Sequence, residues 1–319
     1  MTLPSKVHQF IERHGCLFHQ PWWLDAVCEP PWKWDCVWVE RGREIAAAWP
    51  FAYKMRFGYR LIEMPQMTPY LGPILRPCTA KYAERLAEGE CLLTGLIEQL
   101  PPCAVFHQNF HHSITNWLPL FWKGFQQTTH YTYLIPDTSN LDSLWGELRS
   151  GQRGHIRRAK EIVKVHETSD FRVLLEMIKL TLARQNIKLS HTDEFMRSVD
   201  SVCAERKARR ILVASDTKGR IHTASYQVWD QTTVYLLMNG SDPVLRNSGA
   251  ASLLTWEAIQ LASSMGRRLD FEGSIKESIE RFNRAFGAIQ TPYLVISKTD
   301  SPLVGAYRKI CGWGRKGVL

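Results

Sequence analysis

The 319-residue sequence predicts an α/β (α+β) fold in which a mixed, mainly antiparallel sheet flanked by helices occurs twice in tandem. Three observations predict it. Each half contains a strand pair joined by a glycine turn, each continues as a helix, a strand, a helix and a final strand, and the halves end on similar sequences. With 45% hydrophobic residues, the chain is expected to form a substantial core.

In the first half, apolar segments separated by glycine or proline predict the strands, and a longer apolar periodicity predicts one long helix. In chain order, the segments are an apolar stretch at 18–27, hairpin strands at 35–40 and 45–53 around the turn 41–44, a strand at 59–64, a proline-rich break at 67–77, a helix over about 80–100, a strand at 103–108, a helical segment at 113–125 and a strand at 126–135.

The second half repeats this order after a helical linker region. The linker region has helical segments at 141–163, 170–185 and 193–208, with an extended stretch at 163–167. The repeated segments are strands at 210–215, 221–229 and 232–240, a helix at 251–265, a strand at 267–273, a helix at 274–287 and a last strand at 291–297.

The ends of the two halves align directly. Residues 122–135 match 283–296 at an offset of 161 residues, with Phe125 opposite Phe286. We therefore expect a duplication with its boundary near Pro136, giving domains 1–136 and 137–319.

Composition narrows the function class. No apolar stretch reaches the ~18 residues that span a bilayer, and the N-terminus lacks a signal-peptide centre, so we expect a cytoplasmic protein with no transmembrane segment. The eight cysteines form no CxxC pair, and we expect no metal site. Lys and Arg exceed Asp and Glu by nine, which favours an anionic ligand. The oligomeric state is left open.

The sharpest local pattern lies between a predicted strand and the helix that follows it. It consists of Arg246, Asn247, Ser248, Gly249, Ala250 and Ala251. A small-residue turn lets backbone N–H groups at a helix start approach a pyrophosphate, and the arginine adds positive charge. The alternative is that Ser248 only caps the helix.

The repeated order of strands and helices resembles the tandem GNAT N-acyltransferase superfamily, including the Fem-like aminoacyl and peptidyl transferases. The resemblance covers nearly the whole chain and is carried by the segments 148–161, 219–243 and 270–288. It implies an acyl-CoA-type thioester donor such as acetyl-CoA, held at residues 246–251, and a small-molecule or peptide amine acceptor. The first half lacks a glycine turn at 72–86, so its donor site is expected to be degenerate.

The resemblance also implies a base near the centre of the sheet, which removes the ammonium proton of the amine before it attacks the thioester. Glu272, at the end of a predicted strand, is the candidate base, although it also suits the cap of the next helix. Tyr235 is a candidate proton donor. Tyr226 and Asn239 are candidate substrate ligands, and packing residues are the alternative for all three.

A basic helical segment supplies further candidates. Arg153 and Arg157 are four residues apart and share a face on which an anionic acceptor group is expected to bind, with a solvated helix as the alternative. Asn283 is added because Fem-like enzymes that use tRNA often carry a lysine at this point. An aminoacyl-tRNA-dependent transferase acting on a peptidoglycan precursor therefore remains an alternative function, as does a catalytically silent binding protein of the same fold.

Overall fold

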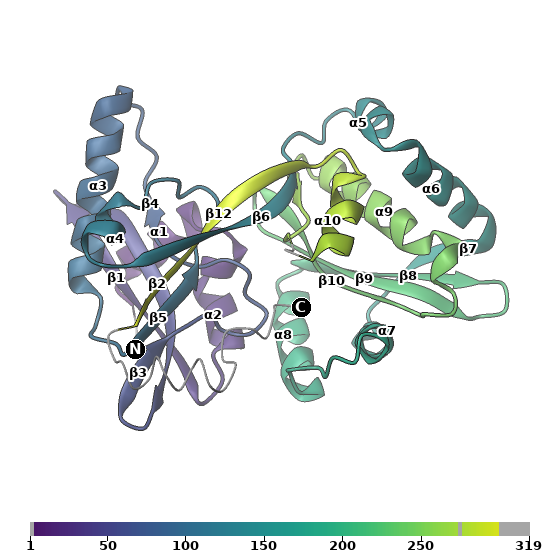
Figure 1. The fold of residues 1–319 in the computed structure, drawn as a ribbon, viewed down its shortest axis with the longest axis horizontal. Coiled ribbons are helices and arrows are strands. Elements are labelled where there is room, and N and C mark those ends of the chain that lie inside the picture. Colours follow the sequence, from purple (N-terminus) through teal and green to yellow (C-terminus); the bar gives the residue numbers. More distant parts are fainter. Residues whose placement is uncertain (1–2, 274–275, 300–319) are drawn as a thin grey trace. The chain divides into compact units, whose positions relative to one another are not determined.

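The computed structural model describes residues 3–273 and 276–299 (Figure 1). The chain divides into two compact units, which we call unit 1 (Met1–His130 and Pro292–Leu319) and unit 2 (Tyr131–Thr291). Strand β6 (Gln126–Ile135) leads from unit 1 into unit 2, and strand β12 (Ile289–Thr299) leads back.

Unit 1 is built on a mixed sheet with the strand order β1-β2-β3-β5-β12, and β4 pairs with β2. Its pairs are antiparallel except for β3 and β5, which are parallel. Besides β12, the strands and helices of unit 1 are β1 (Trp32–Arg41), β2 (Glu44–Arg56), β3 (Tyr59–Ile62), β4 (Ile74–Leu75), β5 (Val105–Asn109), α1 (Ser5–His14), η1 (Leu17–His19), α2 (Pro21–Val27), α3 (Tyr82–Gln99) and α4 (Leu118–Trp122).

Unit 2 has the strand order β6-β11-β10-β9-β8-β7, in which β10 and β11 are parallel and the other neighbouring strands are antiparallel. Its elements are α5 (Leu141–Glu147), α6 (Ser150–Ile162), β7 (Val163–Thr168), α7 (Phe171–Arg184), α8 (Asp193–Glu205), β8 (Arg209–Asp216), β9 (Ile221–Trp229), β10 (Thr233–Ser241), η2 (Arg246–Ser248), α9 (Ala250–Ser264), β11 (Arg268–Asp270) and α10 (Glu277–Arg284).

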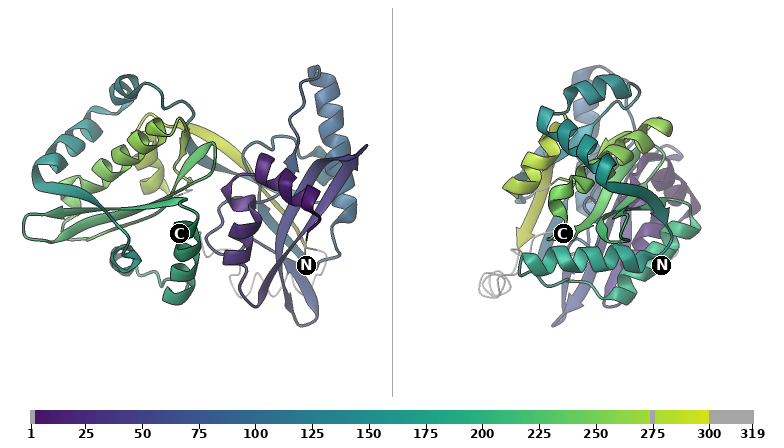
Figure 2. Two further views of the ribbon diagram at one scale, coloured as in Figure 1. Left: turned by 180° about the vertical axis from the view of Figure 1, so that it is seen from behind. Right: turned by 90° about the vertical axis from the view of Figure 1, so that its right-hand side faces the viewer.

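Helices cover both faces of the unit 2 sheet. Helices α7 and α8 lie on one face, and α9 lies on the other with α5, α6 and α10 (Figures 1 and 2). Strand β9 is therefore buried along most of its length, including its polar residues His222 and Gln227. Helix α9 is buried nearly all round because it lies between the sheet and α6.

The structure confirms the predicted α/β class with mixed, mainly antiparallel strands flanked by helices. It also refines single elements. The expected helix at 141–163 is two helices, α5 and α6, separated at Leu148 and Arg149, and the expected proline-rich break contains the short strand β4. The first residues of the expected helix 274–287 lie outside the described residues. The duplication boundary near Pro136 stays a prediction, because compact units and sequence repeats are different divisions of a chain.

None of the helices in the described part of the chain has both the length and the hydrophobicity needed to cross a membrane.

Candidate functional site

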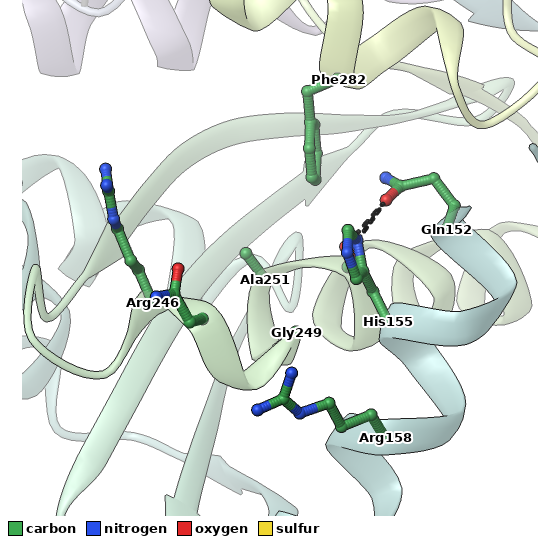
Figure 3. A pocket seen from close by; sticks show the side chains of 9 residues that line it. Gln152, His155, Arg158, Arg246, Gly249, Ala251 and Phe282 are labelled. Atoms are coloured by element: carbon green, nitrogen blue, oxygen red, sulfur yellow. Dashed lines mark hydrogen bonds between the residues drawn. The ribbon is translucent and has the colours of Figure 1, made fainter.

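Unit 2 contains an open pocket of about 520 Å³, within the range of small-molecule sites (Figure 3). It lies where the start of α9 meets α6 and α10. Its lining residues are Gln152, His155, Arg158, Arg246, Asn247, Gly249, Ala251, Ser252 and Phe282.

The floor of the pocket is the turn that precedes α9. Gly249 has φ +82°, a left-handed conformation that favours glycine. A Cβ atom at Gly249 would lie 2.3 Å from the carbonyl oxygen of His155, so the turn touches the backbone of α6. Only a residue without a side chain allows this approach. It brings the first turn of α9, whose N–H groups have no acceptor within the helix, to the pocket.

Helix α6 forms the polar wall. Gln152, His155 and Arg158 are spaced by three residues and therefore lie on one face of the helix. The Oε1 atom of Gln152 accepts from Ser252 Oγ at 3.3 Å and from His155 Nδ1 at 3.0 Å. Its Nε2 atom has no hydrogen-bond partner among the described residues, although Gln152 is only 6% exposed. A buried donor of this kind is satisfied by a bound acceptor or water.

The pocket has a positive electrostatic character. Arg158 and Arg246 are exposed and lie on either side of the Gly249 turn in Figure 3. No Asp or Glu is among the lining residues of the described chain. Together with the helix start, these cations suit an anionic group such as a phosphate.

The structure brings four of the six sequence-predicted turn residues to the pocket. These are Arg246, Asn247, Gly249 and Ala251, whereas Ser248 and Ala250 are buried behind the turn. Ser248 Oγ accepts from the N–H of Ala250, the first residue of α9, at 3.3 Å. The N-cap residue of α9 is Gly249, which provides no side-chain cap. Phosphate binding at this turn stays a prediction.

The basic face predicted on α6 is not the face that lines the pocket. Arg153 Nη1 donates to the carbonyl oxygen of Gly146 at 2.9 Å, and also to that of Leu148, so it satisfies the C-terminal end of α5. Arg157 is exposed, with its guanidinium 5.8 Å from the ring centroid of Trp145. The sequence predicted that the cations at 153 and 157, four residues apart, face the ligand. It did not single out the polar residues at 152, 155 and 158, although their three-residue spacing also indicates one face of a helix.

The two tyrosines are engaged elsewhere. Tyr226 is fully buried on the sheet face covered by α7 and α8, and its hydroxyl donates to Asp200 Oδ1 at 2.9 Å. Asp200 also forms an ion pair with Arg209 at 3.0 Å. Burial raises the pKa of Tyr226 well above its usual value, and nearby Cys203 and Asp200 add to the shift.

Tyr235 and Asn239 lie on β10, outside the pocket lining. Tyr235 is fully buried, and its hydroxyl donates to Asp230 Oδ2 at 2.8 Å. Asn239 is exposed. The structure therefore does not join either residue to the predicted donor site.

Glu272 lies two residues beyond the end of β11 and has φ +56°, an uncommon conformation for a residue with a side chain. Its N–H donates to Asp270 Oδ1 at 2.8 Å, and its own Oε1 is buried with no hydrogen-bond partner in the described chain. Burial raises the pKa of Glu272 well above its ordinary value, and the negative charge of Asp270 raises it further.

Glu272 does not line the pocket, but the adjacent residue Phe271 is linked to the pocket by a series of aromatic contacts. Phe271 contacts Phe286, with ring centroids 5.9 Å apart, and Phe286 contacts the pocket residue Phe282 at 5.1 Å. Asn283, next to Phe282 on α10, is buried, and its Nδ2 atom has no hydrogen-bond partner within the described residues. It is not part of the lining either.

Within residues 3–273 and 276–299, no group of three or more His, Cys, Asp or Glu side chains is arranged to hold a metal ion.

The part of the chain that contains most of the pocket matches a known domain family. Residues 146–277 match the family model described as an acetyltransferase (GNAT) domain, and this range includes every pocket residue except Phe282. No curated protein sequence matches the chain.

Solved structures share the fold over most of the chain. FemX has a TM-score of 0.65 at 13% identity, covering 92% of this chain and 96% of its own. L-PGS from Bacillus licheniformis has a TM-score of 0.55 at 12% identity, covering 95% and 94%. A tandem GNAT protein from the clavulanic acid biosynthesis pathway has a TM-score of 0.50 at 11% identity, covering 88% and 94%.

At such low identities these likenesses concern the fold alone, and they confirm the predicted tandem GNAT-like architecture. Residues 146–277 of this chain therefore match an acetyltransferase (GNAT) domain, and the chain as a whole has a tandem GNAT-like fold.

Proposed function

We propose that this protein is an N-acyltransferase that binds an acyl-CoA-type thioester in unit 2 and transfers its acyl group to an amine. The observation that carries the proposal is the pocket at Gly249, where a helix start, a buried unpartnered amide donor and two arginines meet. Acetyl-CoA is the donor we expect first, because the matching domain family is described as an acetyltransferase.

The pocket suits the diphosphate of such a donor. The N–H groups at the start of α9 supply hydrogen bonds along the favourable end of the helix dipole. Gln152 Nε2 offers one further donor, and Arg158 and Arg246 offer charge-assisted bonds at the pocket rim. All of these groups are on the residues present, so the site needs no metal ion to attract an anion.

We assign the role of general base to Glu272. An amine is a nucleophile only after it loses its ammonium proton, and a carboxylate with a raised pKa accepts that proton more readily than an ordinary one. The Oε1 atom of Glu272 has no hydrogen-bond partner among residues 3–273 and 276–299, and the neighbouring carboxyl group of Asp270 favours protonation. In the reaction, Glu272 accepts one ammonium proton, the C–N bond forms as the thioester C–S bond breaks, and the CoA thiolate leaves and takes up the second amine proton. Tyr226 and Tyr235 take no part in this proposal because their hydroxyls are buried in other hydrogen bonds.

The test is a thermal-shift titration with acetyl-CoA and free CoA, since a ligand that binds only the folded state raises its apparent stability. We expect saturable binding that Arg158→Gln weakens about three- to tenfold, as is reasonable for one charge-assisted bond at an exposed rim. Arg157→Gln is the matched control, because Arg157 is the preceding residue of the same helix and does not line the pocket.

Equal weakening by both variants would mean that the helix charge acts nonspecifically, and the pocket assignment would be wrong. If CoA compounds give no shift, the donor proposal fails. Salt-sensitive binding of aminoacyl-tRNA would then favour the Fem-like alternative. Binding of CoA without turnover on any amine would favour a silent binding protein.

A further inference from the structure

The hairpin formed by β2 and β3 in unit 1 carries an unusual tip. Phe57 and Gly58 are the two connecting residues, with φ +49° and +78°. The ring of Phe57 is 83% exposed, and Met55 and Tyr59 on the adjoining strand ends are exposed as well. Figure 2 shows this end of β2 and β3 projecting beyond the helices of unit 1.

The fold gives no reason for phenylalanine at this position. A two-residue hairpin turn with positive φ at both positions favours Asn-Gly or Asp-Gly, because most side chains are strained there. Phe57 adopts this conformation and buries little of its ring in return. Met55, Phe57 and Tyr59 are all exposed within five residues of the chain, and a group of exposed apolar side chains is typical of a contact with another molecule.

The tip alternates apolar and cationic side chains across the two strands. Met55 pairs with Arg60, and Arg56 pairs with Tyr59. Residues directly opposite each other share a face of the ribbon, so each face carries one apolar or aromatic side chain and one arginine. The Arg56 guanidinium lies 5.4 Å from the ring centroid of Phe57.

The charge at this tip is uniformly positive. The sequence from Tyr53 to Ile62 contains Lys54, Arg56 and Arg60 and no acidic residue. Lys54 is paired with Glu63 at 3.0 Å. The Arg60 guanidinium lies 5.3 Å from the ring centroid of Tyr53, and its Nη1 atom donates to the carbonyl oxygen of Pro102 at 3.4 Å. The tip therefore presents an aromatic and apolar point beside the Arg56 guanidinium, with Arg60 further along the strand.

We propose that this hairpin tip is a contact site for an anionic lipid bilayer, with Phe57 inserted at the headgroup level. Aromatic rings favour the membrane interface, and arginines beside them are attracted to anionic headgroups. The two-residue turn also leaves few backbone groups to desolvate on insertion, since Arg56 and Tyr59 pair next to it. A nucleic acid fits less well, because bases stack on flat aromatic platforms in a groove, whereas Met55 has no ring and the tip projects. The inference does not depend on the acyl donor.

The test is co-sedimentation of the full chain with vesicles of phosphatidylcholine alone or mixed with phosphatidylglycerol in a two-to-one ratio. We expect binding to the anionic vesicles only, and about tenfold weaker binding for Phe57→Asn. Because Asn-Gly is the preferred turn sequence, Phe57→Asn should keep or raise the thermal midpoint, so misfolding does not account for the loss. Tyr82→Asn is the control, since Tyr82 is an aromatic residue 71% exposed on α3.

Three outcomes would overturn the proposal. One is that the wild-type chain does not sediment with anionic vesicles, and a second is that Phe57→Asn binds them as well as wild type does. The third is that Tyr82→Asn weakens binding as much as Phe57→Asn, since the contact would then not be specific to the hairpin. If single-stranded RNA binds instead, and Phe57→Asn abolishes that binding, the partner of the tip is a nucleic acid.

Discussion

Replacement of Gly249 by alanine is expected to destabilise unit 2 by far more than the same change at Gly219. Both glycines have left-handed backbones, with φ +82° at Gly249 and +76° at Gly219. A side chain in this conformation costs about 1–2 kcal/mol at either position. The two sites differ in their surroundings, because a Cβ at Gly249 would meet His155 O at 2.3 Å, whereas no atom of the residues that the structure describes lies within 4 Å of a Cβ at Gly219.

The contact with His155 is backbone, so α6 or the turn must shift to admit a methyl group. Overpacking of this kind costs about 1–3 kcal/mol. We therefore expect Gly219→Ala to lower the unfolding free energy by about 1–2 kcal/mol and Gly249→Ala to lower it by about 2–5 kcal/mol. Equilibrium urea unfolding of both variants measures the difference, with hydrogen exchange of unit 2 peptides to assign the transition.

Equal destabilisation by the two variants would refute the reasoning, because it would show that the approach of the turn to α6 carries no energetic weight. The same geometry changes how donor binding is tested. From the sequence, Gly249→Asp would be expected to abolish binding and leave the fold intact. With His155 O so close, any side chain at Gly249 also disturbs α6, so a loss of binding would not separate the two effects.

Three further predictions concern single side chains. Burial and the charge of Asp270 raise the pKa of Glu272, so the folded state should lose stability as the pH rises from the ordinary glutamate pKa through the raised one. Glu272→Gln should remove this pH dependence of stability in urea midpoints measured from about pH 4 to pH 9. An unchanged pH dependence in the variant would contradict the raised pKa. Arg153→Gln should lower the free energy of unfolding by about 1–2 kcal/mol, because three carbonyl groups near the end of α5 lose their charged donor. Arg157→Gln should lower it by less than about 0.5 kcal/mol. Similar urea midpoints for the two variants would show that Arg153 does not stabilise the end of α5. Tyr226→Phe should lower stability by about 1–3 kcal/mol with CoA affinity unchanged, and a loss of affinity without a loss of stability would return Tyr226 to the binding site.

Much of the fold was predictable because it depends on local patterns. Apolar alternation located the β1–β2 hairpin, and helical periodicity located α3, each within a few residues of its observed bounds. The turn before α9 was also predictable as a turn, because small residues including Gly249 lie between a strand pattern and a helix pattern. Its role in donor binding stays a prediction.

The site itself was only partly predictable. The sequence by itself determined that Arg246 and Gly249 precede a helix, and the structure places both at a pocket. It did not determine which face of α6 completes that pocket. Arg153 instead donates to a carbonyl group at the end of α5, and the Tyr226 hydroxyl donates to Asp200, which is 26 residues away in the sequence. Side-chain periodicity is a property of a short segment, whereas the partner of a buried polar group is chosen by distance in three dimensions. The tertiary structure therefore decided that Gln152, His155 and Arg158, and not the more conspicuous arginines, line the pocket.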